Sequence, residues 1–308
     1  MKILLTTTSF QDTPGHHHKL LESTGFEIDT IRGPVKEDVL LPIIDKYDGV
    51  ICGDDEYSRK VIEKGKNGKL KVISKYGIGL DKIDLDATKE FEISVFNTPG
   101  VNHITVAEHA LALILTYLKN IHLEYNYTRE GKWKRLIGHE LYGKKVGVLG
   151  LGRIGKELVK RLSVFGVELF AYDIAYDDEF INENSIEKAN SIEDLTLKVD
   201  ILSIHMPLTE LTKHSINKNV ISKIKNPLII VNTSRALIVE PKSLLNGLEI
   251  GKLAYLTDVM EEEPMPENHP LKNFDNVIIT PHIGSRTYES VVRQGCMSVE
   301  NLIGAFKV

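Results

Sequence analysis

The chain has 308 residues, a formal net charge of −5 and two cysteines, Cys52 and Cys296. The length allows two domains. The near balance of 38 basic and 43 acidic side chains argues against a nucleic-acid binder. Two cysteines are too few for a disulfide framework, and they do not form a zinc motif. No apolar run is long enough to span a membrane and the first residues turn polar too soon for a signal peptide, so we expect a cytoplasmic protein with no metal site and no membrane or nucleic-acid partner.

The first hundred residues alternate between short apolar runs and stretches with a helical pattern. The apolar runs are residues 3–5, 26–31, 49–52, 70–74 and 93–96, and the helical stretches are 17–23, 37–45, 57–64 and 85–91. This alternation predicts a parallel sheet with helices on both faces, and continuous apolar runs are typical of strands buried on both sides. Pro99 and Gly100 then interrupt the pattern, and we predict a hinge between two domains there.

A long helical stretch, residues 105–121, is apolar on most of its sides. A helix with so little polar surface is typical of a buried position, either in a domain core or in a subunit interface. A second series of strands and helices follows from about residue 145. Its predicted strands are residues 145–149, 168–172, 200–204, 228–232, 254–258 and 276–280, and a helix predicted at 288–306 ends the chain.

A glycine-rich turn follows the first strand of this second series. Gly150, Gly152 and Gly155 have GxGxxG spacing, and Asp173 ends the next predicted strand, 23 residues after Gly150. In dinucleotide-binding folds such glycines allow a tight turn and a close approach of the pyrophosphate, and the acid bonds the ribose 2′-hydroxyl. Asp173 would repel a 2′-phosphate, so the pattern predicts NAD rather than NADP. The alternative is an ordinary glycine turn and a surface aspartate.

Three later predicted strands end in polar residues. They deliver Asn232–Arg235, Thr257 with Asp258, and Thr280–His282, and Glu263 follows Asp258 by five residues. Ligands of open parallel sheets bind beyond the carboxyl ends of the strands, so these groups are expected to converge. A histidine suits proton transfer near neutral pH, a carboxylate would orient it, and an arginine offers a planar fork to a substrate carboxylate. Taken singly, each residue also fits a surface or structural role.

The ordered motifs of the whole chain resemble the D-isomer-specific 2-hydroxyacid dehydrogenases, close to their phosphoglycerate dehydrogenase branch. The motifs are KYGIGLD at 75–81, NTPG at 97–100, VAEH at 106–109, GLGRIG at 150–155, HMPLT at 205–209, NTSR at 232–235, DV at 258–259 and TPHIG at 280–284. The resemblance implies an α/β protein of two doubly wound parallel-sheet domains. A Rossmann NAD-binding domain, residues 100–284, would be inserted into a flavodoxin-like substrate domain, residues 1–99 and 285–308. It also implies a homodimer through the cofactor domains, which would explain the apolar stretch 105–121.

The resemblance implies residue roles as well. Arg235 would bind the substrate carboxylate and keto group, and His282 would form the acid/base pair with Glu263, preferred to Glu261 and Glu262. The predicted substrate-binding residues are Lys75, Tyr76, Gly77, Ile78, Gly79 and Arg235, with the backbone amides around Ile78 and Gly79 holding the carboxylate. The predicted cofactor-binding residues are Gly150, Gly152, Arg153, Ile154, Gly155, Asp173, His205, Pro207, Thr233, Asp258 and His282, of which Asp258 would contact the nicotinamide carboxamide and His205 could equally be structural.

We therefore predict an NAD-dependent oxidoreductase that transfers a hydride between the nicotinamide and C2 of a small D-2-hydroxy or 2-keto acid. Two alternatives stay open: oxidation of 3-phosphoglycerate in serine biosynthesis, and an NAD-binding regulatory protein similar to a corepressor. Lys75 stands where the phosphoglycerate branch often has arginine and could bind a phosphate, but residues 54–56, Asp-Asp-Glu, would repel one unless they point away. An acidic loop could instead favour a substrate with an amino or hydroxyl group.

Overall fold

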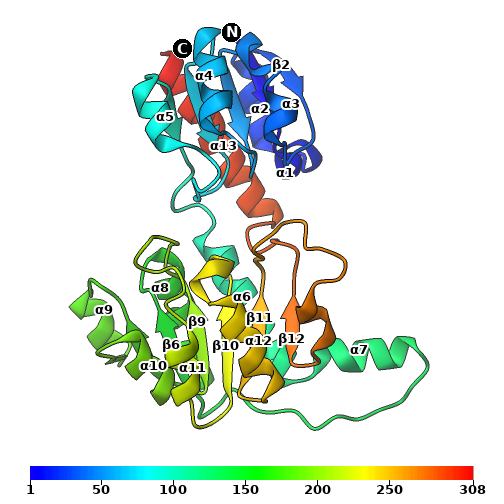
Figure 1. The fold of residues 1–308 in the computed structure, drawn as a ribbon, viewed down its shortest axis with the longest axis vertical. Coiled ribbons are helices and arrows are strands. Elements are labelled where there is room, and N and C mark those ends of the chain that lie inside the picture. Colours follow the sequence, from blue (N-terminus) through cyan, green and yellow to red (C-terminus); the bar gives the residue numbers. More distant parts are fainter. Residues whose placement is uncertain (308) are drawn as a thin grey trace. The chain divides into compact units, whose positions relative to one another are not determined.

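The protein is described by a computed structural model that covers residues 1–307 (Figure 1). The chain divides into two compact units, one made of Met1–Asn102 and the segment from Ser285 onward, the other of His103–Gly284. The change from the first unit to the second falls three residues after the hinge predicted at 99/100, and the return falls at 284/285. Residue 308, included in the predicted substrate domain, lies outside the described residues.

The first unit contains a five-stranded sheet in which all strands are parallel. Its strands are β1 (Lys2–Leu5), β2 (Glu27–Thr30), β3 (Gly49–Cys52), β4 (Val72–Lys75) and β5 (Ser94–Phe96). Their order is β2-β1-β3-β4-β5, which is the flavodoxin-like order. All residues of β3 and β4 are buried, as the continuous apolar runs predict. The register pairs Cys52 with Lys75, so the segments that leave these two strands are neighbours.

Helices cover both faces of this sheet. They are α1 (Thr8–Asp12), α2 (His16–Ser23), α3 (Glu37–Leu40), α4 (Arg59–Asn67), α5 (Leu85–Glu90) and α13 (Tyr288–Phe306), with a 3-10 turn at Ile44–Lys46. Because alternate strand residues point to opposite faces, Leu4 joins one core and its neighbours Ile3 and Leu5 join another. The second core includes Val299 and Leu302 of α13, so the two ends of the chain fold together.

The second unit contains a seven-stranded parallel sheet. Its strands are β6 (Lys145–Leu149), β7 (Glu168–Tyr172), β8 (Glu187–Lys188), β9 (Ile201–Ile204), β10 (Leu228–Asn232), β11 (Leu253–Thr257) and β12 (Val277–Ile279). The order β12-β11-β10-β9-β6-β7-β8 is the Rossmann order, counted from β6 as the first strand, with one more strand at the β12 edge. The fold class predicted from the sequence is therefore confirmed for both units.

The helices of the second unit are α6 (His103–Leu118), α7 (Ile121–Arg129), α8 (Arg153–Leu162), α9 (Asp178–Glu183), α10 (Ile192–Lys198), α11 (Lys218–Lys223) and α12 (Pro241–Glu249). Short 3-10 turns lie at Ser163–Phe165, Ala236–Ile238 and Pro270–Asn273. Within residues 1–307, no helix is both long and apolar enough to cross a membrane.

The single helical stretch predicted at residues 105–121 is wrong at its end. α6 stops at Leu118, and Asn120 has a left-handed backbone with φ +53°, which a right-handed helix cannot continue. A second helix, α7, starts at Ile121. The apolar residues of α6, among them Ala110 and Ile114, enter the core of their own unit. Burial inside the unit therefore accounts for the apolar sequence of α6 without a partner subunit.

Candidate active site

Three neighbouring strands of the second unit bring the predicted catalytic segments to one edge of the sheet. The register pairs Asn232 at the end of β10 with Thr257 of β11, and Thr257 with Ile279 of β12. Arg235, Asp258 and His282 follow these aligned positions. Adjacent strands lie about 4.8 Å apart, so the sheet itself gathers residues that are far apart in the sequence.

His282 and Glu263 form a hydrogen-bonded pair at this edge. His282 Nδ1 lies 2.7 Å from Glu263 Oε2, and Glu263 Oε1 accepts a hydrogen bond from the backbone N–H of Met260 at 2.9 Å. Because a carboxylate only accepts, Nδ1 carries the shared hydrogen and Nε2 is the nitrogen that can exchange a proton with a substrate. Glu261 lies near a different histidine, with its Oε2 3.8 Å from His269 Nε2.

Asp258 fixes the backbone on both sides of His282. Its side chain is buried, and its Oδ1 accepts hydrogen bonds from the Thr280 hydroxyl at 2.6 Å and from the N–H of Ile283 at 2.8 Å. Its Oδ2 accepts the N–H of Gly284 at 2.7 Å. His282 itself has a left-handed backbone, φ +53°, which is unfavourable without such support.

A residue of α6 completes this cluster. His109 Nε2 lies 3.0 Å from the Thr280 hydroxyl and 3.4 Å from Asp258 Oδ1. Since the hydroxyl hydrogen goes to Asp258, His109 is the donor to Thr280. Burial alone would raise the pKa of Asp258, but hydrogen bonds from His109, Thr280 and two backbone N–H groups hold that pKa below its ordinary value. Asp258 is therefore an anionic anchor.

The loop that carries Arg235 is shaped by Asn232. The buried Asn232 Oδ1 accepts the N–H of Ser234 at 3.1 Å, and its Nδ2 donates to the carbonyl of Arg235 and to the hydroxyl of Tyr255, both at 3.0 Å. Burial raises the pKa of Tyr255 to about 12, so that hydroxyl stays protonated. Arg235 Nη1 donates to the carbonyl of Ser234 at 2.8 Å. These contacts fix the conformation of the loop after β10 and hold one end of the Arg235 guanidinium against that loop.

The glycine turn after β6 uses each glycine for a different reason. Gly150 has φ +97°, and a Cβ there would lie 2.9 Å from the backbone of His205 and Met206. A Cβ at Gly155 would lie 2.1 Å from the carbonyl oxygen of Gly150, so the start of α8 could not approach the strand. A Cβ at Gly152 would meet no atom within 4 Å. The space beside Gly152 is the room that a pyrophosphate needs.

Asp173 is anchored next to this turn. Its carboxylate accepts the N–H of Leu151 at 2.6 Å and the N–H of Ala175 at 3.1 Å. Arg153 and Ile154 begin α8, where the first N–H groups of a helix have no partner within the helix. The turn therefore places the start of α8 and the carboxylate of Asp173 next to each other.

Two further predicted cofactor residues carry buried polar atoms without a hydrogen-bond partner, His205 Nδ1 and Thr233 Oγ1. His205 Nε2 lies 2.8 Å from the Ser203 hydroxyl, and burial lowers the pKa of His205 to about 4, so the ring is neutral near pH 7. Buried polar atoms are rarely left unpaired. Together with the open space at Gly152, they fit a bound dinucleotide.

Pro207, another predicted cofactor residue, lies in the loop after β9, and its carbonyl accepts a hydrogen bond from the Thr212 hydroxyl at 2.6 Å.

The remaining predicted substrate-binding residues lie in the first unit, where the chain leaves β4. They are Lys75, Tyr76, Gly77, Ile78 and Gly79. Gly77 has φ +121°, and its N–H donates to the Thr98 hydroxyl at 2.9 Å. Asn97 Nδ2 donates to the carbonyl of Ile78 at 2.9 Å. The segment with the NTPG motif therefore shapes this turn.

Sequence reasoning did not select His109 as a site residue, and it placed Thr280 among the converging strand-end residues without giving it a role. Both belong to motifs quoted above, and a histidine on an otherwise apolar helix was the available signal. Their role depends on a contact between residues 171 positions apart, which no local pattern reveals.

Residues 111–284 match the family model described as "D-isomer specific 2-hydroxyacid dehydrogenase, NAD binding domain". The chain is 38% identical over 305 residues to a D-3-phosphoglycerate dehydrogenase of Methanocaldococcus jannaschii, covering 98% of this chain and 57% of that protein. It is also 38% identical over 282 residues to a hydroxypyruvate reductase of Thermotoga maritima, covering 90% of each. The solved structure of an NAD-dependent formate dehydrogenase from Staphylococcus aureus in complex with NAD has a TM-score of 0.85 at 29% identity, covering all of this chain and 96% of that one.

The two curated relatives differ in length. The chain spans little more than half of the phosphoglycerate dehydrogenase but nearly all of the hydroxypyruvate reductase.

Proposed function

Since the chain belongs to the family of D-isomer-specific 2-hydroxyacid dehydrogenases and carries the NAD-binding domain of that family, we propose that it transfers a hydride between NAD and C2 of a small D-2-hydroxy or 2-keto acid. The observation that carries this proposal is the 2.7 Å pair of His282 and Glu263 at the same sheet edge as Arg235. A histidine paired with a carboxylate can transfer the proton, and an arginine at the same end of the sheet can bind the substrate carboxylate, as reduction of a keto acid needs.

The residues divide the chemistry as follows. NADH, when bound, supplies the hydride for reduction. Arg235 binds the substrate carboxylate with its planar guanidinium and polarises the keto oxygen. His282 donates a proton from Nε2 to the carbonyl oxygen in reduction and accepts it back in oxidation, while Glu263 stabilises the charged ring. The backbone amides around Ile78 and Gly79 are the second group that we propose for the carboxylate.

The cofactor residues follow from the turn and its neighbours. We propose that Gly152, Arg153, Ile154 and the helix end hold the pyrophosphate, and that Asp173 binds the ribose hydroxyls and selects NAD over NADP. His205, Pro207 and Thr233 would line the pocket of the nicotinamide half. Asp258 Oδ2 has one protein donor, which leaves a lone pair for the carboxamide.

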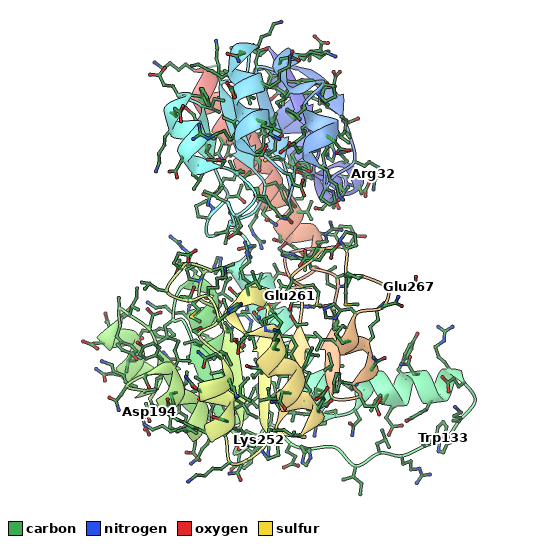
Figure 2. The ribbon with its side chains drawn as sticks, in the orientation of Figure 1. Arg32, Trp133, Asp194, Lys252, Glu261 and Glu267 are labelled. Atoms are coloured by element: carbon green, nitrogen blue, oxygen red, sulfur yellow. The ribbon has the colours of Figure 1, made fainter. Side chains whose placement is uncertain are left out.

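A homodimer is part of the proposal. Residues 121–142, here named the arm, comprise α7 and the loop that returns to the end of α6, and Figure 1 shows them extending away from the sheet of the second unit. The arm exposes Trp133 by 80% and Ile137 by 96%, and Figure 2 shows Trp133 near its outer end. Apolar side chains gathered on a projecting segment favour an interface with a second copy.

A cytoplasmic location is proposed from the cysteine usage and composition.

The test is a steady-state assay of the whole protein with a panel of 2-keto acids. Glyoxylate, pyruvate, hydroxypyruvate and 3-phosphohydroxypyruvate are each supplied with NADH or NADPH, and oxidation of the cofactor is followed by absorbance. We expect turnover with NADH, a strong preference for NADH over NADPH, and loss of turnover in Arg235→Ala. Tight NADH binding without turnover of any acid would contradict the proposal. The alternative of a regulatory protein finds no support in the comparisons, since the relatives described above are named for dehydrogenase or reductase activities.

A further inference from the structure

Lys75 is a buried ammonium at the carboxyl end of β4. Its side chain is only 5% exposed. Its Nζ donates to Asp54 Oδ1 at 2.9 Å and to the carbonyl of Tyr76 at 3.2 Å. Because a buried charge is costly unless it is paired and hydrogen-bonded, Asp54 is the counter-charge that stabilises Lys75 at this position.

Asp55, the next acid in the loop, has a structural role. It is fully buried, and its carboxylate accepts the N–H of Val35 at 2.6 Å and the N–H of Gly53 at 3.0 Å, together with the Thr6 hydroxyl. Burial raises the pKa of Asp55 above its ordinary value. Its contacts tie two loops of the first unit together and leave it no surface for a ligand.

Glu56 also faces the protein, since its Oε2 accepts the N–H of Glu37 at the start of α3 at 3.3 Å. Asp54 is different, because it pairs with Lys75 and its side chain is still 58% exposed. Of the three acids that follow β3, Asp54 is therefore the one that pairs with Lys75 while its side chain stays more than half exposed.

The Asp54–Lys75 pair lies against the turn proposed for the substrate carboxylate. A Cβ placed on Gly77 would be 3.4 Å from Lys75 Nζ, so the ammonium lies directly beside this turn. Two of the three hydrogens of the ammonium are already donated, to Asp54 and Tyr76.

We propose that Asp54 determines the substrate class: by neutralising Lys75 it disfavours a phosphorylated acid, and the enzyme takes a short 2-keto acid without a phosphate. A phosphate dianion binds where unpaired cations offer hydrogen-bond donors. Here the ammonium of Lys75 is balanced by Asp54, and the half-exposed carboxylate of Asp54 repels a dianion. This inference rests on the proposed function, and it selects among the substrate classes left open by that function.

The experiment measures the ratio of kcat/KM for 3-phosphohydroxypyruvate to that for hydroxypyruvate, with NADH, in the whole protein. We expect the wild type to prefer hydroxypyruvate. Asp54→Asn, and independently Asp54→Ser, should raise the ratio by about tenfold or more, because one charge repulsion is removed and Lys75 is released. In the double variant Asp54→Asn with Lys75→Met this gain should shrink to the part that comes from the removed repulsion, because the released cation is absent.

A matched control is Glu90→Gln. Glu90 pairs with Arg59 at 2.7 Å and is 56% exposed, so this variant removes an equally exposed acid of the same unit. Its ratio should equal that of the wild type. A wild-type preference for the phosphorylated acid would overturn the inference, and so would an unchanged ratio in both Asp54 variants. The next cation to test would then be Arg286, which donates to the Thr8 hydroxyl in this unit. Absence of turnover with every 2-keto acid would instead overturn the proposed function, and the inference with it.

Discussion

Two carboxylates fix the position of His282. Glu263 holds the ring through Nδ1 at 2.7 Å, and Asp258 holds the backbone on either side of the ring through the N–H of Ile283 and the hydroxyl of Thr280. The first carboxylate bonds the ring itself, and the second bonds the segment that carries the ring. The two substitutions below separate these effects.

Glu263→Gln should lower kcat for keto-acid reduction by about 100-fold or more, because the acid/base residue loses its charged partner. Reduction needs the charged ring, so the rate falls as the pH rises. Without the carboxylate the charged ring is less stable, and this fall should move to lower pH. The measurement is a pH profile of kcat under conditions in which chemistry limits the rate.

Glu262→Gln is the control for that experiment, since Glu262 is the adjacent acid and is exposed. An equal loss in both variants would mean that the charge of the loop, and not the pair with His282, matters. A flat profile from about pH 6 to 9 in the wild type would count against His282 as the proton donor.

Asp258→Asn should reduce the free energy of unfolding at pH 7 by about 1–3 kcal/mol, because an amide cannot accept from all the donors that meet this carboxylate. The pKa of Asp258 is lowered in the folded protein. Its contribution to stability is therefore fully present above about pH 4 and is lost as the pH falls through the lowered value. The gap between wild type and variant in urea unfolding should close at acidic pH.

Asp178→Asn is a matched control in the same unit, because Asp178 forms an exposed pair with Lys188. We expect a change of less than about 0.5 kcal/mol. A gap for Asp258→Asn that is constant down to the acid transition would show that the carboxylate does not stabilise the fold by its charge.

Among the elements, the turn between β6 and α8 makes the sharpest distinction between folding and binding. Its three glycines follow one motif, but only Gly150 and Gly155 are required by packing. Gly152 has φ −67° at the start of α8, so its backbone accepts any residue, and its surroundings are open. The requirement at Gly152 comes from the ligand.

Gly152→Ala should therefore leave the melting temperature unchanged and weaken NADH binding by about tenfold, which corresponds to ~1.4 kcal/mol. Gly155→Ala should destabilise the protein by about 1–3 kcal/mol or more, because its Cβ would overlap the carbonyl of Gly150. Thermal unfolding and a fluorescence titration with NADH measure the two effects. Unchanged NADH affinity in Gly152→Ala would contradict the proposed pyrophosphate site.

Other elements were poorly predicted for a local reason. β8 has two exposed residues, Glu187 and Lys188, and so lacks the apolar run by which a strand is found in a sequence. The break between α6 and α7 depends on the left-handed backbone of Asn120, while the residues on both sides remain compatible with a continuing helix. In contrast, β6, β7, β10 and α13 have the predicted bounds.

At the scale of the whole molecule, the arm carries large apolar side chains that its own unit leaves exposed, among them Trp133 and Ile137. Trp133→Glu combined with Ile137→Glu should convert a dimer of twice 34.6 kDa into a monomer, because two charges would be buried in the proposed interface. Light scattering after size-exclusion chromatography measures the mass. Leu211→Glu, at a side chain that is 94% exposed outside the arm, should remain dimeric. A monomeric wild type would contradict the homodimer.

The sequence by itself determined the α/β class, most strands, the glycine turn with Asp173, and the three polar segments at strand ends. These features are local: an apolar run, a turn motif and a fixed spacing are readable without knowing what lies across the fold. The choice of Glu263 over its acidic neighbours came from the resemblance, and the structure brings Glu263, and not Glu261, to His282.

Only the tertiary structure decided which polar groups act together. The contact of His109 with Thr280 and the pairing of Lys75 with Asp54 join residues that are distant in the chain, and no local pattern shows that the two residues of either pair meet. The acidic run at residues 54–56 reads as one charged loop in the sequence. In the fold Asp55 is buried, Glu56 faces α3 and Asp54 faces Lys75, because burial and pairing depend on which strands and helices become neighbours.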